Sequence, residues 1–249
     1  MSDSYDVIAR LSDLRDQSER RYMHTESVFL NEEELSEASA RFPESDRIRY
    51  DGGYPGARKK KVIFLRDEED DFSDIVCISA DIDQRFRSIG HRDILGSLMS
   101  LQIDRHSFGD FWMEEGRIYL YTSSSMAEFL CSNFLRIANL NVSFEVLEEH
   151  PVQTFYTREF EAVAANARLD SLTAVLAKVS RSEAQRMIRQ EKVQVNHRPL
   201  VDPAEVCNND CTISIRGVGR FTFLGVERRT RKDRSVVRFS QDIQGKERA

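Results

Sequence analysis

The side chains with the clearest chemistry in this sequence are long polar residues between positions 181 and 192. Arg181, Gln185, Arg189 and Lys192 recur every three or four residues. On a helix, at 100° per residue, they gather within about 80° of one side. Cationic side chains replace the counterions of a nucleic-acid backbone, and an amide can hydrogen-bond the edge of a base. The spacing therefore predicts a helix face that binds nucleic acid.

Two short helices would position these side chains, within a segment (residues 168–215) that also holds a tight strand pair and a further strand. Leucine and valine residues at helical spacing from Leu169 to Val179 predict a first helix that buries one stripe. Ser180 ends that helix and is expected to cap the next, with Glu183 completing a capping box. The opposite, apolar side of the second helix is formed by Ala184, Met187 and Ile188.

The same segment resembles the S4-type RNA-binding domain, which is named after a ribosomal protein of the small subunit. The resemblance rests on Arg168-Leu169-Asp170, Ser180-Arg181-Ser182-Glu183-Ala184, Ile188, Val193, Val195-Asn196, Asp202-Pro203 and Asn209-Asp210. It implies that this part of the chain binds RNA. The residues expected at the interface are Arg168, Lys178, Arg181, Ser182, Gln185, Arg186, Arg189, Lys192, Asn196, His197 and Arg198.

Three positions depart from the usual S4 pattern. Glu191 stands where a glycine usually ends a helix, His197 where Val-Asn-Gly is usual, and Asn209 where Gly-Asp is usual. Asn tolerates a left-handed backbone, whereas Glu and His do so less readily. The departures leave the local turn geometry open but do not affect the assignment of the domain.

Charge divides the chain into two parts. Its 249 residues, 40% of them hydrophobic, are enough for two or three domains with filled cores. Residues 166–249 hold 17 Lys and Arg against 10 Asp and Glu, whereas residues 1–165 hold 19 against 32. The asymmetry predicts a basic, RNA-facing end joined to an acidic body.

The four cysteines (Cys77, Cys131, Cys207 and Cys211) are too scattered for a disulfide framework, and we interpret them as small buried or turn residues.

The first 72 residues are expected to form an α/β domain. Residues 4–21 and a segment capped by Asn31 predict two helices, the second with three glutamates in its first turn. Two strands, residues 47–50 and 61–65, flank a loop with three glycines and a proline. The basic end of this loop is either the solvated end of a long hairpin or a secondary RNA contact. The residues of that contact would be Arg58, Lys59 and Lys60.

Residues 73–150 show the order of elements β-α-β-β-α-β. The expected strands are residues 75–80, 108–113, 117–122 and 142–147, and the expected helices are residues 91–101 and 125–138. This order is typical of ferredoxin-like domains, including RNA-recognition motifs, but the signature of the third strand of those motifs is absent. Tyr119 and Tyr121 share one strand face, where they could stack bases or cover the sheet against a neighbouring domain.

Two short motifs invite a catalytic interpretation but do not support it. His91-Arg92-Asp93 would need an Asn where Leu98 stands, and a Gly-rich loop, to be a kinase catalytic segment. Arg168-Leu169-Asp170 also occurs around the catalytic aspartate of pseudouridine synthases, but here it opens the RNA-binding domain. We therefore expect a protein without enzymatic activity, without a bound metal and without a cofactor.

The C-terminal residues predict a hairpin. Residues 221–226 and 235–239 are expected strands, and the turn between them is the densest group of cations in the chain. Residues 151–165 are expected to be a linker, and residues 241–249 a disordered tail. The turn between the two expected strands is expected to add secondary RNA contacts at Arg228, Arg229, Arg231 and Lys232.

No signal peptide or apolar run of membrane length is present in the sequence, so we expect a cytoplasmic protein that does not insert into membranes.

Over its whole length the chain resembles the bacterial YlmH family. The motifs that carry the resemblance are Asp51-Gly52-Gly53-Tyr54-Pro55-Gly56-Ala57, His91-Arg92-Asp93-Ile94-Leu95-Gly96, residues 168–196, and Ile215-Arg216-Gly217-Val218-Gly219-Arg220-Phe221. Members of the family are encoded near cell-division genes. They are also linked to ribosome-associated quality control, in which they bind large subunits obstructed by peptidyl-tRNA.

The resemblance implies an α+β fold in three parts. We expect an N-terminal α/β domain (residues 1–72), a ferredoxin-like domain (73–150), a linker (151–165), an S4-type domain (166–240) and a tail (241–249). The expected partners are ribosomal RNA and tRNA on the large ribosomal subunit, bound by a monomer. Two alternatives are a cell-division factor that acts through its acidic body and an RNA-modifying enzyme targeted by its S4-type domain.

Overall fold

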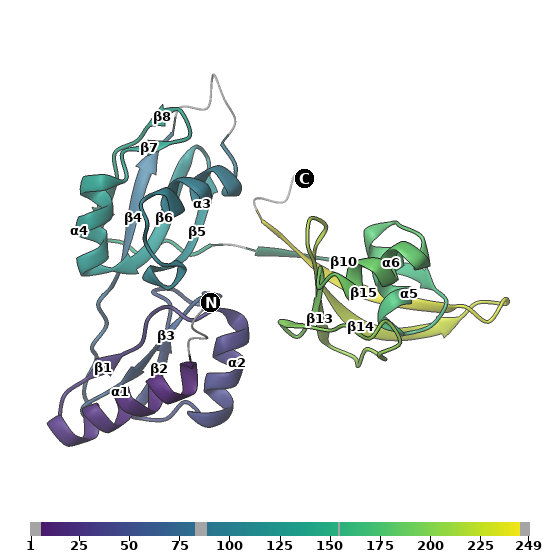
Figure 1. Ribbon diagram of the computed structural model, residues 1–249, viewed down its shortest axis with the longest axis horizontal. Coiled ribbons are helices and arrows are strands. Elements are labelled where there is room, and N and C mark those ends of the chain that lie inside the picture. Colours follow the sequence, from purple (N-terminus) through teal and green to yellow (C-terminus); the bar gives the residue numbers. More distant parts are fainter. Residues whose placement is uncertain (1–5, 83–88, 154, 245–249) are drawn as a thin grey trace. The chain divides into compact units, whose positions relative to one another are not determined.

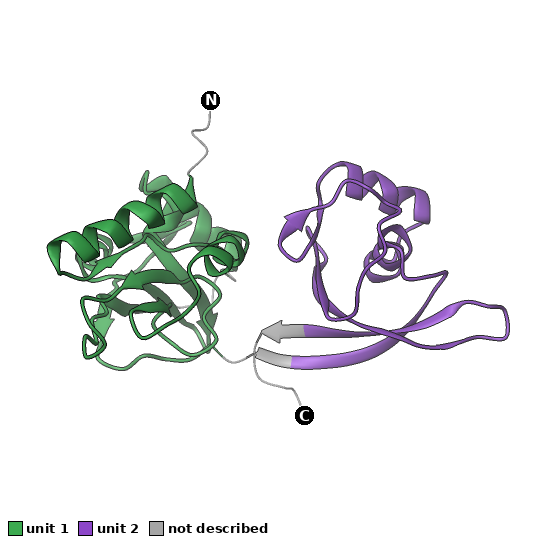
Figure 2. Ribbon diagram, turned by 90° about the horizontal axis from the view of Figure 1, so that it is seen from below, with its two compact units in different colours: residues 1–153 green, residues 154–249 purple. Residues whose placement is uncertain are grey.

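The computed structural model describes residues 6–82, 89–153 and 155–244. The chain divides into two compact units, which we call unit 1 (Met1–Gln153) and unit 2 (Thr154–Ala249) (Figure 2). Among the described residues, no helix is both long and apolar enough to cross a bilayer.

Unit 1 begins with two helices packed on a small sheet (Figure 1). The elements are α1 (Val7–Arg21), β1 (Thr25–Glu26), α2 (Glu32–Arg41), β2 (Ile48–Asp51) and β3 (Lys61–Phe64), with the antiparallel strand order β1-β3-β2. The expected cap of the second helix is confirmed: the Asn31 side chain accepts from the amides of Glu33 and Glu34, and the Glu34 carboxylate accepts from the Asn31 amide at 2.7 Å. This capping box fixes the start of α2.

The second part of unit 1 is an antiparallel four-stranded sheet with two helices on one face (Figure 1). Its main elements are β4 (Ile75–Asp81), α3 (His91–Ser100), β5 (Phe108–Glu114), β6 (Arg117–Ser123), α4 (Ser124–Asn133) and β9 (Glu145–Leu147). A 3-10 turn, η1 (Arg105–Ser107), precedes β5, and a short hairpin of β7 (Arg136–Ile137) and β8 (Leu140–Asn141) follows α4. The strand order is β5-β6-β4-β9, and α3 and α4 bury their apolar sides against the sheet.

Two expectations for this part need correction. The helix predicted over residues 125–138 ends at Asn133, and Ala138 takes a left-handed backbone (φ 52°) in the turn of the β7–β8 hairpin. The strand predicted from residue 142 begins only at Glu145. The apolar residues before it, Val142 and Phe144, still face the core, which explains why they looked like a strand in the sequence.

Unit 2 is a six-stranded antiparallel sheet packed against two helices. Its elements are β10 (Phe155–Ala164), α5 (Leu169–Ala177), α6 (Arg181–Arg189), β11 (Val193–Val195), β12 (Arg198–Pro199), β13 (Cys211–Ile215), β14 (Gly219–Arg229) and β15 (Ser235–Gln244). The order is β10-β15-β14-β13-β11-β12. Leucines of α5 and Ile188 of α6 share one core with the sheet residues Phe221, Phe223 and Phe239. The two cysteines of this unit, Cys207 and Cys211, are buried free thiols, as expected.

Two predicted boundaries in unit 2 were wrong. The expected linker at residues 151–165 is mostly β10, which pairs with β15 over its whole length from Phe155↔Gln244 to Ala164↔Ser235. The first residues of the expected tail, 241–244, are the end of β15; residues 245–249 lie outside the described residues. The strand pair therefore ties both ends of unit 2 into one sheet.

Candidate nucleic-acid interface

The centre of the cationic surface on unit 2 is a buried carboxylate, Asp170, in the first turn of α5. Its side chain is fully buried. Arg181, at the start of α6, donates to both carboxylate oxygens, from Nε at 2.9 Å and from Nη2 at 3.1 Å. Gln185 Nε2, one turn later, donates at 2.8 Å, and Arg168 Nε lies 3.6 Å from Asp170 Oδ1. Three residues expected to contact RNA thus converge on one acid.

The ion pairs set the protonation state of Asp170. Burial alone would raise the pKa of its carboxyl group. The hydrogen bonds from Arg181 and Gln185, with the charges of Arg181 and Arg168, outweigh burial, so the pKa of Asp170 lies below its usual range. The carboxylate is therefore ionised at neutral pH, and it holds two half-exposed guanidinium groups in fixed orientations.

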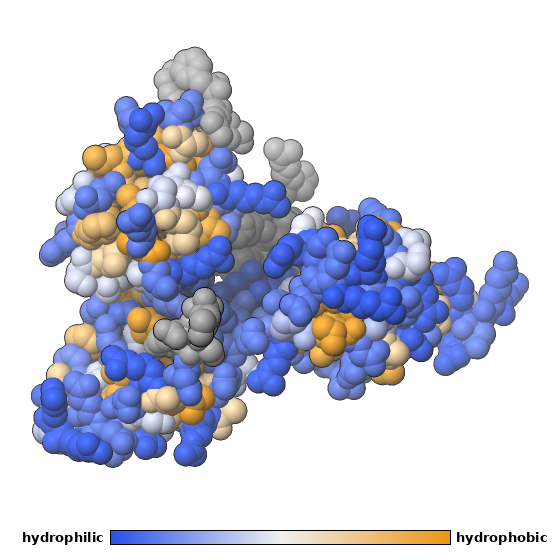
Figure 3. Space-filling model, in the orientation of Figure 1, coloured by the Kyte–Doolittle hydropathy of each residue, from blue (hydrophilic) through white to orange (hydrophobic). Residues whose placement is uncertain are grey.

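Helix α6 presents the remaining cations. Ser180 caps it, accepting from the Glu183 amide at 3.2 Å. The expected capping box is only half formed, because the Glu183 carboxylate accepts from Arg186 Nη2 at 2.7 Å. Ala184 and Ile188 are buried on the inner side of the helix. Hydrophilic side chains cover most of the visible face of unit 2 (Figure 3). The exposed residues of the predicted interface around α6 are Lys178, Arg181, Ser182, Arg186, Arg189 and Lys192.

The turns that were open in the sequence are formed without glycine. Glu191 (φ 55°) follows α6 in a left-handed conformation, and so do Asn196 (φ 49°) and His197 (φ 67°) between β11 and β12. Two consecutive residues with positive φ make the two-residue hairpin turn that matches strand twist. The Asn196 side chain accepts from the Thr212 amide at 2.9 Å, so this predicted contact residue also holds the hairpin to β13.

The third departure, Asn209, does not take a left-handed backbone; its neighbour Asp210 does (φ 62°). Asn209 instead packs against Gly225 of β14, where a Cβ would lie 3.0 Å from Asn209 Oδ1. A glycine in the opposite strand makes room for the larger side chain at this position.

The cations of the β14–β15 hairpin are less available than the sequence suggested. Arg228 pairs with Glu161 at 2.8 Å and with Glu227 at 3.2 Å, and Arg229 pairs with Asp233 at 2.6 Å. Exposed surface pairs of this kind are individually weak, but each places an acid beside a cation. Arg231 and Lys232 are exposed at the end of the hairpin.

Two lysines at the basic end of the unit 1 loop, Lys59 and Lys61, point inward, so the interpretation as a solvated hairpin end was wrong for these two residues. Lys59 Nζ donates to the carbonyls of Arg105 at 2.6 Å and Phe108 at 2.9 Å, and lies 4.5 Å from the centre of the Phe108 ring. Burial lowers the pKa of Lys59 to about 8. The next-but-one lysine, Lys61, is buried in ion pairs with two acids, Glu26 and Asp74.

The loop covers the face of the four-stranded sheet that does not carry the helices. Tyr54 packs against Tyr121, with ring centroids 4.9 Å apart, and its hydroxyl donates to Asp110 Oδ2 at 2.8 Å. Gly53 fits because it lacks a side chain: a Cβ would lie 2.4 Å from Tyr121 Cδ1. Tyr121 is fully buried, so of the two interpretations packing holds for it. Tyr119 stays partly exposed and stacks on Trp112 at 5.1 Å.

Family models match two parts of the chain. One, described as "Putative RNA-binding domain in YlmH", matches residues 67–153, and the other, the S4 domain, matches residues 168–208. The chain thus combines a domain of the type found in YlmH with an S4 domain. The S4 match contains Asp170 and all eleven residues expected at the main RNA interface. The YlmH match covers β4 to β9, including the sheet face closed by the loop around Tyr54.

Two bacterial proteins are similar to this chain. A Bacillus subtilis (strain 168) protein, named "Ribosome-associated protein quality control protein P2", is 27% identical over 200 residues, covering 78% of this chain and 77% of the relative. The solved structure of "Cell division protein ylmH from Streptococcus pneumoniae" covers 59% of this chain and 92% of its own, with 16% identity and a TM-score of 0.46. The two domain matches make this chain an RNA-binding protein.

Proposed function

We propose that this chain is a non-enzymatic protein that binds ribosomal RNA and tRNA on the large ribosomal subunit and acts in the rescue of particles that carry peptidyl-tRNA. The observation that carries the proposal is the Asp170 cluster, in which a buried acid orients Arg168, Arg181 and Gln185 beside the exposed cations of α6. The name of the Bacillus subtilis relative, which refers to ribosome-associated quality control, supports the ribosome as the site of action. Such a protein would work in the cytoplasm.

The surface around α6 suits a phosphate backbone. A guanidinium group that is already oriented loses little conformational entropy when it binds, and a planar fork matches phosphate oxygens. Arg181 uses Nε and Nη2 on Asp170, so its other nitrogen would face the RNA. We assign phosphate contacts to Lys178, Arg181, Arg186, Arg189, Lys192 and Arg198, and secondary contacts to Arg231 and Lys232.

We also infer that residues 73–150 are a ferredoxin-like domain. The strand order β5-β6-β4-β9 places the first and third strands of the β-α-β-β-α-β series at the centre, with both helices on one face. In RNA-recognition motifs the opposite face stacks bases. Here that face is occupied by Tyr54 and its loop, so the main RNA interface is assigned to unit 2.

The test is co-sedimentation of the full-length protein with purified large ribosomal subunits over a series of KCl concentrations. Arg189→Ala with Lys192→Ala removes two exposed cations and leaves the Asp170 cluster intact. The dependence of log affinity on log salt should become shallower by about two, roughly one for each phosphate that the variant no longer neutralises. The control is Arg10→Ala with Arg41→Ala in unit 1, which removes the same charge from α1 and α2.

Two results would contradict the proposal. One is a parent protein that does not sediment with the subunits at low salt. The other is a unit 2 double variant that binds with unchanged affinity and salt dependence while its melting temperature matches that of the parent. Arg181 is unsuitable as the first target, because its removal would leave the buried charge of Asp170 without its main partner.

A further inference from the structure

The motif His91-Arg92-Asp93-Ile94 at the start of α3 contains two residues whose side chains are exposed. Asp93 caps the helix by accepting from the Gly90 amide at 3.0 Å, and Ile94 is buried in the core of the sheet. His91 and Arg92, the first two residues of the helix, are both exposed. Their side chains are therefore available for a ligand.

The His91 ring forms a flat, supported surface. It stacks on Phe111 of β5 with ring centroids 4.2 Å apart and planes 19° apart, and Phe111 is itself buried. Burial of the inner side of the imidazole lowers the pKa of His91, so the ring is neutral at neutral pH. A neutral aromatic ring with its other face exposed is what an unpaired base stacks on.

Cationic residues from three separate segments lie along the same strand. Strand β5 is at the edge of its sheet. Arg92 adjoins the His91–Phe111 stack, and Phe111 contacts Phe108 edge-on at 6.0 Å. Lys59 Nζ donates to the backbone carbonyls of both Phe108 and Arg105. Arg105 is itself an exposed residue.

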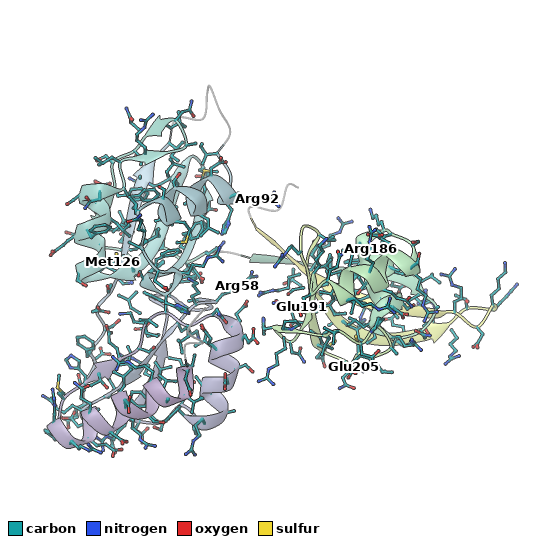
Figure 4. The ribbon with its side chains drawn as sticks, in the orientation of Figure 1. Arg58, Arg92, Met126, Arg186, Glu191 and Glu205 are labelled. Carbon is teal, nitrogen blue, oxygen red and sulfur yellow. The ribbon has the colours of Figure 1, made fainter. Side chains whose placement is uncertain are left out.

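Arg58 is a further cationic residue beside β5. Its amide donates to Asp110 of β5 at 2.6 Å, and Figure 4 shows Arg58 and Arg92 on the same flank of unit 1. Three acids lie among these cations. Asp110 accepts from the Tyr54 hydroxyl and from the amides of Arg58 and Lys59. Asp104 and Glu34 both pair with the ring of His106. The acids beside β5 are thus held in contacts within the unit, and the side chains of Arg92 and Arg105 are exposed.

We propose that the edge of β5 binds a single-stranded segment of RNA, with a base stacked on His91 and phosphates on Arg58, Arg92 and Arg105. The site rests on the proposed function, to which it adds a second contact formed by unit 1. Only an unpaired base can lie flat on a ring, so the site favours a loop or a single strand over a duplex. An acidic peptide would satisfy the cations but would leave the exposed imidazole face unused.

The test measures binding of a fluorescently labelled oligouridine of about ten nucleotides to the full-length protein. His91→Ala should weaken binding about tenfold, as expected for loss of one stacked base, and His91→Phe should restore it. Arg92→Ala with Arg105→Ala should make the salt dependence shallower by about 1.4, since each neutralised phosphate of a single strand contributes about 0.7. The matched control is His24→Ala, because His24 also stacks on a phenylalanine, Phe72, at 3.5 Å.

The outcomes separate this site from the main interface. If the His91 and Arg92/Arg105 variants bind oligouridine like the parent, while the Arg189/Lys192 variant is impaired, the β5 site is wrong and the proposed function stands. If the parent binds neither oligouridine nor large subunits, both are overturned. The fluorescence of the single tryptophan, Trp112 on β5, reports whether each variant of unit 1 keeps its fold. Should His91→Ala fail to fold, the variant with Arg92→Ala and Arg105→Ala still decides the question.

Discussion

Asp170→Asn is the most informative single change in unit 2, because it keeps the shape of the side chain and removes its charge. In the parent, the buried carboxylate accepts two hydrogen bonds from Arg181 and one from Gln185. In the variant, the amide nitrogen would face these donors. The two guanidinium groups near it would lose their counter-charge.

The expected loss of unfolding free energy is about 2 kcal/mol at neutral pH. Breaking a fully buried ion pair typically costs about 3–5 kcal/mol. Here the side chain of Arg181 is 47% exposed, so water can solvate the released guanidinium and the cost is smaller. Removal of the charge from exposed Glu205 by Glu205→Gln should have almost no effect and serves as the control.

The pH dependence gives an independent check. The pKa of Asp170 is lowered in the folded state, so its contribution is fully present above the unfolded value of about 3.9. It is lost as the pH falls through the lower, folded value. The stability difference between parent and Asp170→Asn should therefore be constant near neutral pH and shrink in acid.

The measurement is hydrogen exchange of peptides from α5 and α6 in urea, with the fluorescence of Trp112 as an internal control that reports unit 1 alone. RNA binding should also weaken, because Arg181 loses its fixed orientation. If the unfolding free energy obtained from exchange in α5 and α6 matches that of the parent within about 0.5 kcal/mol at neutral pH, the structural role of Asp170 is refuted. Tighter RNA binding by the variant would show that Asp170 holds the Arg181 guanidinium away from the RNA.

Three other expectations concern turns and buried groups. Glu191→Gly should stabilise unit 2 by roughly 1 kcal/mol in urea unfolding, because it relieves a left-handed backbone; a loss of stability would contradict this. Gly53→Ala should destabilise unit 1 by more than about 3 kcal/mol, through its clash with Tyr121, and parent-like melting would argue against it. Burial raises the pKa of Cys77 to about 12, so its stabilisation is present below about pH 8.5 and lost as the pH rises towards 12. Cys77→Ala should flatten the alkaline fall of stability, and an equal slope would exclude that cause.

Local patterns in the sequence predicted the elements that depend on neighbouring residues. The apolar spacing from Leu169 and the cap at Ser180 gave α5 and α6, because helix periodicity and capping are encoded within a few positions. Strand β10 was missed because its partner β15 lies about 70 to 90 residues later. Charged residues at its exposed positions, such as Glu159 and Glu161, gave it the composition of a linker.

The types of residue at the candidate site could be read from the sequence, but not how they are held. The cations on α6 follow from helical spacing, whereas their anchor, Asp170, lies 11 residues before Arg181 and 15 before Gln185. That contact depends on the packing of α5 against α6, which no local pattern specifies. In the same way, the burial of Lys61 could not be predicted locally, because the two acids that make it tolerable, Glu26 and Asp74, lie far from it in the sequence.

The closed sheet face of unit 1 determines where that unit could contact RNA. Tyr54 and Gly53 fill the face that RNA-recognition motifs leave open, and there is no room at Gly53 for even a methyl group. A base could not enter there unless the loop were expelled and Tyr121 exposed. The loop that closes the face also carries Arg58 to the edge of β5, where Asp110 anchors it. The N-terminal loop therefore closes the sheet face and contributes Arg58 to the proposed site, which is why the β5 edge, and not the face, is the place to test.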